Sequence, residues 1–429
     1  MVNHLIVEPG LFGLYSALSC SKFLPIPRLL RATKKPSDFV GRLRVPRTGF
    51  EPAHLAALLP ENSASTNFAT WAGTQPLKIG VQIYWFLGFG KLFFASREAT
   101  FAGMRFLIIQ TAFLGDVVLA TPVVEQLRKF YPEDRIDFLL RKGNESLLKG
   151  HPKLDEVLVW NKQEHKTRNL WGMMRTIRAR KYDYVINLQR FASSGLITAF
   201  SGAYTIGFDK NPLSRYFTER KPHVIGSDPK HYVHEVQRNL SLIEGLTDNT
   251  FVKPKLYPSS ADYAATAPLK GEPYITMSPA SVWFTKQLAR EKWAELIDAY
   301  PAEQTIYLLG APGDKALTEG LATKSKVISL AGQLTLLQST ALMADARMNY
   351  VNDSAPMHLA SAMNAPTTAV FCSTVPYFGF GPLADNSRIV ETPVALDCRP
   401  CGLHGYKACP QGHFKCALTI PVELLKGGA

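Results

Sequence analysis

The chain has 429 residues, of which 46% are hydrophobic and 19% charged, a balance typical of a folded protein with two or three domains and not of a disordered one. Its formal net charge is +13 and its pI about 9.4, which favours an acidic partner such as an anionic membrane surface, a phosphorylated substrate or nucleic acid. Because no run interleaves aromatic with basic residues, nucleic acid is not expected among the partners.

The first 103 residues differ from the rest of the chain. They show no sustained periodicity, and they carry 11 Lys and Arg against 5 Asp and Glu, whereas the other 326 residues carry 37 against 30. The best apolar run, at 79–90, has about half of the roughly 20 residues that a spanning helix requires, and the N-terminus lacks the charge order of a signal peptide. Met104 stands directly before the first clear strand. We therefore expect residues 1–103 to be a misassigned start or a poorly ordered extension, and the alternative is a membrane-associating arm.

Residues 104–260 alternate between short apolar runs and helical periodicities. The pattern predicts strands at 106–109, 135–140, 157–160, 182–188 and 203–208, and helices at 117–127, 169–182 and 231–246. Such alternation is typical of a parallel, doubly wound sheet. Basic residues follow several of the strands and could bind an anionic acceptor, although a solvated basic surface would look the same; they are Arg141, Lys142, Arg190, Lys210 and Arg215.

The same alternation resumes in residues 271–429. Strands are predicted in 274–277, 305–314, 326–332, 348–352 and 367–374, and helices in 281–297, 334–346 and 355–365. Residues 249–270 are rich in Pro, Ser and Ala and have the character of a linker. No period of 20 to 50 residues repeats, which excludes a solenoid. The chain is therefore predicted to contain an extension, 1–103, and two α/β domains, 104–260 and 271–429.

The clearest segment is FLIIQTAFLGDVVLATPVVEQL, residues 106–127, which predicts a strand, a polar turn and a helix. In an open α/β sheet, ligands bind beyond the carboxyl ends of the strands, so Asp116 in this turn is expected at the functional site. Gly115 would let a ligand approach the backbone closely. The alternative for Asp116 is a purely structural cap of the helix.

Two turns in the second half carry further candidates. In SPASVWFTKQLAREKW, Thr285 and Lys286 precede a helix, where a lysine and free amides can bind a phosphate; the alternative is a surface lysine. In NDSAPMHLASA, Asp353 and Ser354 precede a helix with a proline in its first turn. A carboxylate and amides there could hold a sugar or a ribose, and the candidates one turn further on are Met357 and His358, the latter alternatively a packed core histidine.

Four of the six cysteines, Cys398, Cys401, Cys409 and Cys416, form the pattern C-x2-C-x7-C-x6-C. Four thiolates can bind zinc, and an iron–sulfur site or two disulfides would also fit the spacing. So few cysteines in so long a chain favour a cytosolic location. GxGxxG after the first strand, GxxxxGK[ST], HExxH and GxSxG are all absent, which counts against a dinucleotide oxidoreductase and a P-loop enzyme.

Together the motifs make the chain from Met104 to its C-terminus resemble the bacterial lipopolysaccharide heptosyltransferases, glycosyltransferase family 9. The motifs are, in order, LGDVVLATPVV, SPASVWFTKQLAREKW and VNDSAPMHLASAMNAPTTAVFCST. The resemblance implies the GT-B fold, in which two Rossmann-like domains with parallel sheets face a central cleft. It implies that 104–260 bind the acceptor and 271–429 the nucleotide sugar. The implied reaction is the inverting transfer of a heptose from ADP-heptose to the lipid A–Kdo inner core of lipopolysaccharide.

The resemblance also implies roles for single residues. Asp116 would be the catalytic base, Lys286 with Thr285 beside it would bind phosphate, and Asp353 would bind the donor. Ala355 stands where the family usually has glycine. No metal or other cofactor is required if Lys286 and helix dipoles neutralise the leaving group, and similar cysteine patterns in the family imply a structural cap.

The implied location is the cytoplasmic face of the inner membrane of a Gram-negative-type bacterium, where the protein would act as a peripheral enzyme on an acidic glycolipid. Two alternatives remain open. One is a GT-B enzyme that uses another nucleotide sugar. The other is a nucleotide-binding module without transferase activity.

Overall fold

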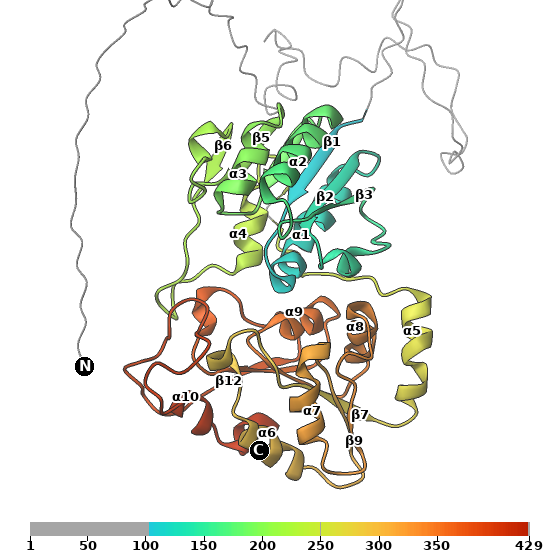
Figure 1. The fold of residues 1–429 in the computed structure, drawn as a ribbon, viewed down its shortest axis with the longest axis vertical. Helices are drawn as coiled ribbons and strands as arrows, with labels where there is room; N and C mark the ends of the chain where they lie inside the picture. Colours follow the sequence, from blue (N-terminus) through green and yellow to red (C-terminus); the bar gives the residue numbers. More distant parts are fainter. Residues whose placement is uncertain (1–102, 249, 428–429) are drawn as a thin grey trace, which may run out of the picture. The chain divides into compact units, whose positions relative to one another are not determined.

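The structure is a computed structural model that describes residues 103–248 and 250–427 (Figure 1). The expectations of a misassigned start, a poorly ordered extension or a membrane-associating arm fall on residues outside this description. The described residues form two six-stranded sheets in which every neighbouring pair of strands is parallel. This confirms the prediction of two Rossmann-like halves.

The first sheet has the strand order β3-β2-β1-β4-β5-β6. Its strands are β1 (Arg105–Ile109), β2 (Arg135–Arg141), β3 (Glu156–Trp160), β4 (Tyr184–Asn187), β5 (Tyr204–Phe208) and β6 (Glu219–Lys221). The helices that accompany it are α1 (Leu114–Phe130), α2 (Lys166–Arg180), α3 (Ala192–Ala199) and α4 (Glu235–Ser241). We call residues 103–248 the first lobe. Helix α1 packs beside α4, and α2 packs beside α3.

The central strand β1 is buried on both faces, which explains its unbroken apolar sequence. Phe106 and Ile108 belong to the core under α1, while Leu107 and Ile109 belong to the core under α2 and α3. All four side chains are fully buried. The two cores hold β1 in place, so the position of its carboxyl end is fixed by packing on either side.

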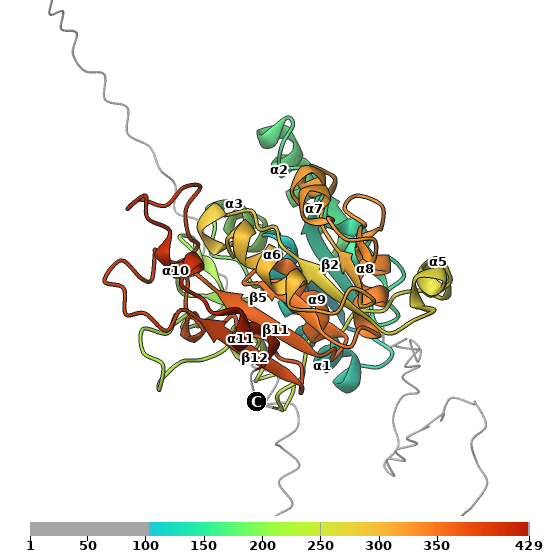
Figure 2. The same ribbon diagram turned by 90° about the horizontal axis from the view of Figure 1, so that it is seen from below.

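The second sheet has the order β12-β11-β10-β7-β8-β9. Its strands are β7 (Tyr274–Ser278), β8 (Thr305–Leu308), β9 (Val327–Ser329), β10 (Asn349–Asn352), β11 (Thr367–Phe371) and β12 (Ser387–Glu391). The helices are α5 (Ser260–Thr266), α6 (Arg290–Asp298), α7 (Lys315–Leu321), α8 (Leu336–Ala344), α9 (Ala355–Ala362), α10 (Lys415–Leu418) and α11 (Val422–Lys426). We call residues 250–427 the second lobe. Helices α8 and α9 contribute to one core and α6, α7, α10 and α11 to the other, and α11 lies close to β12 (Figure 2).

The strand orders of the two sheets are the same. Counted along the chain within each lobe, both run 3-2-1-4-5-6, the order of dinucleotide-binding Rossmann folds. In this order the direction of winding reverses between the first and fourth strands, which are β1 and β4 in the first lobe and β7 and β10 in the second. Ligands of such folds bind at the carboxyl ends of these strands.

Several predicted boundaries were wrong. The expected linker 249–270 contains α5, whose first turn is capped by Ser259 and Asp262. The helix expected from residue 231 begins only at Glu235, and the helix expected within 281–297 begins at Arg290, after a short 3₁₀ turn, η7 (Phe284–Lys286). Helices α3 and α7 and strands β6 and β12 were not predicted, because their short segments lack a clear period.

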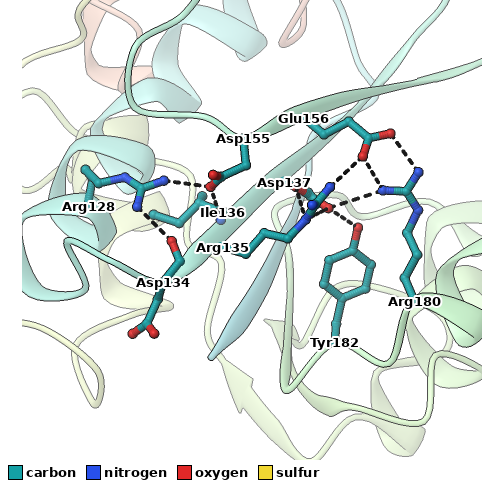
Figure 3. Close-up of polar contacts among 9 residues, drawn as sticks. All are labelled: Arg128, Asp134, Arg135, Ile136, Asp137, Asp155, Glu156, Arg180 and Tyr182. Carbon is teal, nitrogen blue, oxygen red and sulfur yellow. Dashed lines mark hydrogen bonds and ion pairs between the residues drawn. The ribbon is translucent and has the colours of Figure 1, made fainter. Parts of the chain in front are cut away.

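A charged network joins the strand starts of the first lobe, at the edge opposite the carboxyl ends (Figure 3). The side chain of Asp137 is fully buried; Arg135 Nε lies 3.0 Å from it, and the hydroxyl of Tyr182 donates to it at 2.5 Å. Arg180, at the end of α2, pairs with Glu156 at 2.5 Å and with Asp137 at 3.4 Å. Beside it, Arg128 pairs with Asp155 at 2.7 Å. These contacts tie α1 and α2 to the sheet.

The two lobes touch through α1 and α9 and through the start of α4. The backbone amide of Glu235 donates to the carbonyl of Gly379 at 2.8 Å, and the guanidinium of Arg238 donates to the carbonyl of Phe378 at 3.0 Å. Among the described residues, none of the helices combines the length and apolarity needed to cross a bilayer.

Candidate active site

Four candidate residues follow the four strands at which the direction of winding reverses, two strands in each sheet. Asp116 follows β1, Arg190 follows β4, Lys286 follows β7 and Asp353 follows β10. Both lobes therefore direct polar residues to the edge at which Rossmann folds bind ligands. The four strands that precede these residues are buried, so each residue follows a rigid element.

Asp116 is the third residue of α1 and not the turn residue that was predicted. Its Oδ2 accepts the backbone amide of Phe113 at 3.2 Å, so the carboxylate does close the first turn of the helix. Burial raises the pKa of Asp116 to about 6, and the negative charge of Glu235 raises it further, while the amide of Phe113 and the charges of Lys286 and Arg190 oppose the shift. A carboxylate with this pKa is a stronger base than an exposed aspartate.

Gly115 and His358 lie at a close approach of α1 to α9. A β-carbon on Gly115 would lie 2.8 Å from Cδ2 of His358, so a side chain at residue 115 would collide with the imidazole ring. His358 is buried, and its Nδ1 has no hydrogen-bond partner among the described residues. Burial lowers the pKa of His358 to about 3, so the ring is neutral at pH 7. His358, a predicted donor-binding candidate with a packed core histidine as the alternative, is thus a buried residue that lies against Gly115.

Lys286 and Asp353 form a mostly buried ion pair. The distance from Nζ to Oδ2 is 2.7 Å, and the two side chains are 16% and 7% exposed. Asp353 Oδ2 also accepts the hydroxyl of Thr374 at 2.6 Å. Sequence analysis missed Thr374, which follows β11 and lies 21 residues from Asp353 along the chain. The carboxylate therefore orients the lysine, whose cationic end remains partly open.

The other predicted residues of the second lobe mainly make packing and backbone contacts. Thr285 is 1% exposed, and its hydroxyl contacts Ser373 and the backbone of Tyr406. Met357 is fully buried in the core shared with α1. Ser354 is the N-cap of α9, but its hydroxyl makes no capping bond. The amides at the start of α9 are consequently not capped by that side chain.

Asn352 also belongs to the framework of the site. It is fully buried, its side-chain amide donates to the carbonyl of Pro279 at 2.9 Å, and its oxygen accepts the amide of Leu288 at 2.9 Å. These bonds fix both ends of the loop that carries Lys286. Only a long-range contact reveals this role, so the sequence alone could not assign it.

Glu235 is a further buried acid near Asp116. It accepts Nε of Arg238 at 2.7 Å and lies 3.4 Å from Nε2 of His223. These partners lower the pKa of Glu235 to about 2 against the opposing effect of burial, which is the largest single influence. The acid is therefore ionised, and its charge acts on Asp116 at the start of the neighbouring helix.

The four clustered cysteines do not form a metal site in the structure. Within residues 103–248 and 250–427, no group of three or more His, Cys, Asp or Glu side chains is arranged to hold a metal ion. Cys398, Cys401, Cys409 and Cys416 are all free thiols. Burial and the three neighbouring thiols raise the pKa of Cys416 to about 11. The proposed structural metal is therefore not supported, and the two disulfides are not formed.

Comparison with protein families gives a clear assignment. The sequence model of glycosyltransferase family 9 (heptosyltransferase) matches residues 170–405, more than half of the chain. The chain belongs to glycosyltransferase family 9. This confirms the resemblance that three motifs predicted, and it makes the protein a glycosyltransferase.

The relatives of this family 9 protein are distant in sequence, but the alignments with them cover most of each relative's length. Lipopolysaccharide heptosyltransferase 3 of Escherichia coli is 27% identical over 285 residues, which are 61% of this chain and 82% of the relative. Lipopolysaccharide heptosyltransferase 1 of Pseudomonas aeruginosa is 25% identical over 323 residues, 70% and 86% of the two chains. The structure of E. coli ADP-heptose lps heptosyltransferase II has the same fold, with a TM-score of 0.58, 20% identity and coverage of 73% and 97%.

Proposed function

We propose that this family 9 protein transfers a heptose from ADP-heptose to the lipid A–Kdo inner core of lipopolysaccharide, with inversion at the anomeric carbon. The observation that carries the proposal is the partly buried Asp116, whose pKa is raised to about 6, at the carboxyl edge of the first sheet. The names of the heptosyltransferase relatives support the donor and the acceptor class. The first lobe would bind the acceptor and the second lobe the nucleotide sugar.

Asp116 acts as the general base in this mechanism. It takes the proton from an acceptor hydroxyl as the hydroxyl oxygen attacks the anomeric carbon from the face opposite the leaving group. One such attack inverts the anomeric configuration. Arg190 and the basic residues after β2 and β5 bind the acidic groups of the acceptor, and the lack of a side chain at Gly115 lets His358 pack against the start of α1.

The leaving group is a nucleoside diphosphate, which gains negative charge as the glycosidic bond breaks. Lys286 stabilises that charge, and Asp353 holds its ammonium group in place. Ser354, His358 and the amides at the start of α9 bind the donor on the same side, aided by the helix dipole. Thr285 and Met357 support these groups by packing. Because a lysine and amides supply the positive charge, we propose that the transfer needs no metal ion.

A peripheral site at the cytoplasmic face of the inner membrane follows from the acceptor, which is a membrane lipid. Helix α2 supports this location. It contains no acidic residue, and Arg168, Trp171, Arg175 and Arg178 repeat at helical spacing on its exposed side. Trp171 is 60% exposed. Arginines beside an exposed tryptophan suit a surface of anionic headgroups.

The test is a donor panel with purified protein and a Kdo–lipid A acceptor. ADP-heptose should be used at least 100-fold faster than UDP- and GDP-sugars, and the product should have the opposite anomeric configuration to the donor by NMR. Treatment with a chelator should leave the rate unchanged. Transfer from a UDP- or GDP-sugar would instead establish the alternative, a GT-B enzyme with another donor.

Asp116→Ala separates a transferase from a nucleotide-binding module. We expect turnover to fall by about 10² to 10⁴-fold, the range for loss of a general base, with the affinity for ADP kept within about threefold. Glu133→Ala is the matched control, because Glu133 is an exposed acid of the same lobe. Turnover that is unchanged in Asp116→Ala would exclude Asp116 as the base.

A further inference from the structure

We infer that residues 398–416, here called the cysteine segment, position the Lys286–Asp353 pair for the diphosphate of the donor. The segment contacts the pair's supports at two places, Gly405–Tyr406 and Arg399. This inference rests on the proposed function for the identity of the diphosphate, but the contacts themselves do not depend on it. It assigns positioning residues to a part of the chain that the mechanism above does not use.

The first contact fixes the residue directly before Lys286. The backbone amide of Thr285 donates to the carbonyl of Tyr406 at 3.1 Å, and the amide of Tyr406 donates to the hydroxyl oxygen of Thr285 at 2.7 Å. Ser373 donates to the same oxygen at 3.1 Å. Thr285 is held on both its backbone and its side chain, so the start of the lysine side chain has one position.

Gly405 makes this contact close enough to touch the lysine itself. Its φ is +73°, a conformation that favours glycine. A β-carbon there would lie 2.7 Å from Oγ1 of Thr285 and 3.0 Å from Cγ of Lys286. The backbone of the segment therefore packs directly against the side chain of Lys286, and any larger residue at 405 would push the two apart.

The second contact acts on Asp353. Arg399 donates from Nε to the carbonyl of Cys372 at 2.7 Å and from its second amino group to the carbonyl of Thr374 at 2.7 Å, and it pairs with Glu391. The hydroxyl of Thr374 then donates to the carboxylate of Asp353, which binds Lys286. Arg399 thus fixes the turn that orients the carboxylate.

The cysteines give the segment its shape. The thiol of Cys401 donates to the carbonyl of Cys398 at 3.1 Å, and the amide of Cys401 donates to the carbonyl of Ser373 at 2.8 Å. Cys416 is buried in the core of the second lobe. Phe414 stacks on Phe284, the first residue of η7, with ring centroids 4.7 Å apart. The backbone of Cys401 and the ring of Phe414 therefore join the segment to Ser373 and to the start of the lysine turn.

The test compares two glycines of the segment. Gly405→Ala introduces a collision with Thr285 and Lys286, whereas Gly412→Ala introduces the same strain, at φ +69°, with nothing within 4 Å. Acetylation of Lys286, followed by mass spectrometry on the full chain, should be at least fivefold faster in Gly405→Ala than in the wild type. Gly412→Ala should match the wild type. Equal rates in all three proteins would overturn the inference, whatever the donor is.

A second pair of variants, with milder substitutions, keeps the test decisive if Gly405→Ala does not fold. Arg399→Lys retains the charge beside Glu391 but cannot reach three acceptors, and Arg388→Lys is the control because Arg388 binds Thr368 and Leu425 at the far side of the lobe. Arg399→Lys should weaken ADP binding about tenfold without changing adenosine binding, and it should raise the donor KM but not the acceptor KM. Equal losses for ADP and adenosine would contradict positioning of the phosphate site.

A wild type that transfers no heptose would refute the proposed function, while the labelling result would still decide this inference.

Discussion

Asp116 combines two roles in one carboxylate. It closes the first turn of α1 through the amide of Phe113, and it is the candidate base. Burial and the nearby charge of Glu235 raise its pKa to about 6. A base must be deprotonated to act, so the rate should depend on pH around this value.

We expect kcat/KM to rise about tenfold per pH unit below pH 6 and to level off above pH 7. Glu235→Gln removes a negative charge that favours the protonated acid, so the midpoint should move to lower pH. Glu244→Gln, at an exposed acid that binds Lys221, should leave the midpoint unchanged. A wild-type midpoint near pH 4, the value of an ordinary aspartate, would contradict the raised pKa.

Other residues of the site could be named from the sequence only in part. Asp116 lies in the first turn of α1, Lys286 in η7 after β7, and Asp353 between β10 and α9, so local strand and helix patterns point to all three. Thr374, Asn352, Arg399 and Tyr406 act through bonds to residues 21 to 121 positions away. Their types and spacing carry no local signal, because the sheets bring them together.

At the level of elements, the charged network of Figure 3 lies at the edge of the first sheet opposite the candidate site. Its centre, Asp137, is fully buried and bonded to Arg135, Arg180 and Tyr182. Replacing a buried charge leaves its partners uncompensated. The network should therefore matter for stability and not for substrate binding.

We expect Asp137→Asn to lower the free energy of unfolding by about 3 kcal/mol, measured by urea denaturation, with the acceptor KM unchanged within about twofold. Asp298→Asn is the control. It removes an acid from an exposed pair with Lys324 in the second lobe, and such pairs contribute about 0.5 kcal/mol. A large rise in acceptor KM for Asp137→Asn would show that the two edges of the first sheet are coupled.

Helix α2 makes a separate prediction about membrane binding. Arginines near an anionic surface contribute about 1 kcal/mol each, so Arg168→Gln with Arg175→Gln should weaken binding to phosphatidylglycerol-containing vesicles about 10- to 30-fold. Vesicle sedimentation at 0.1 M salt measures this. The control replaces Lys255 and Arg347, two exposed cations of the second lobe, by Gln and changes the net charge equally. If both double variants lose vesicle binding equally, the protein is attracted to the vesicles by its total charge and not by α2, which would contradict the prediction.

For the whole molecule, the sequence predicted the architecture better than the boundaries. Unbroken apolar runs such as Phe106–Ile109 favour strands covered on both faces, and their alternation with helices indicates parallel sheets. The segment 249–270 was misjudged because α5 is short and Ala-rich, and its cap at Ser259 resembles a loop. Helix α3 was not predicted, because Gly195 and small polar residues interrupt the helical pattern of its sequence.

The shared strand order of the two sheets has a consequence for how such proteins diversify. The main chain passes from one sheet to the other once, between β6 and β7, and each sheet brings its own pair of strand ends to the site. On the proposed assignment, the acceptor and the activated sugar are recognised by different lobes. Recombination near residue 250 between relatives could therefore create a new pairing of acceptor and sugar in one step, provided that the contacts between the lobes are matched, among them those of Arg238, Gly115 and the shared core.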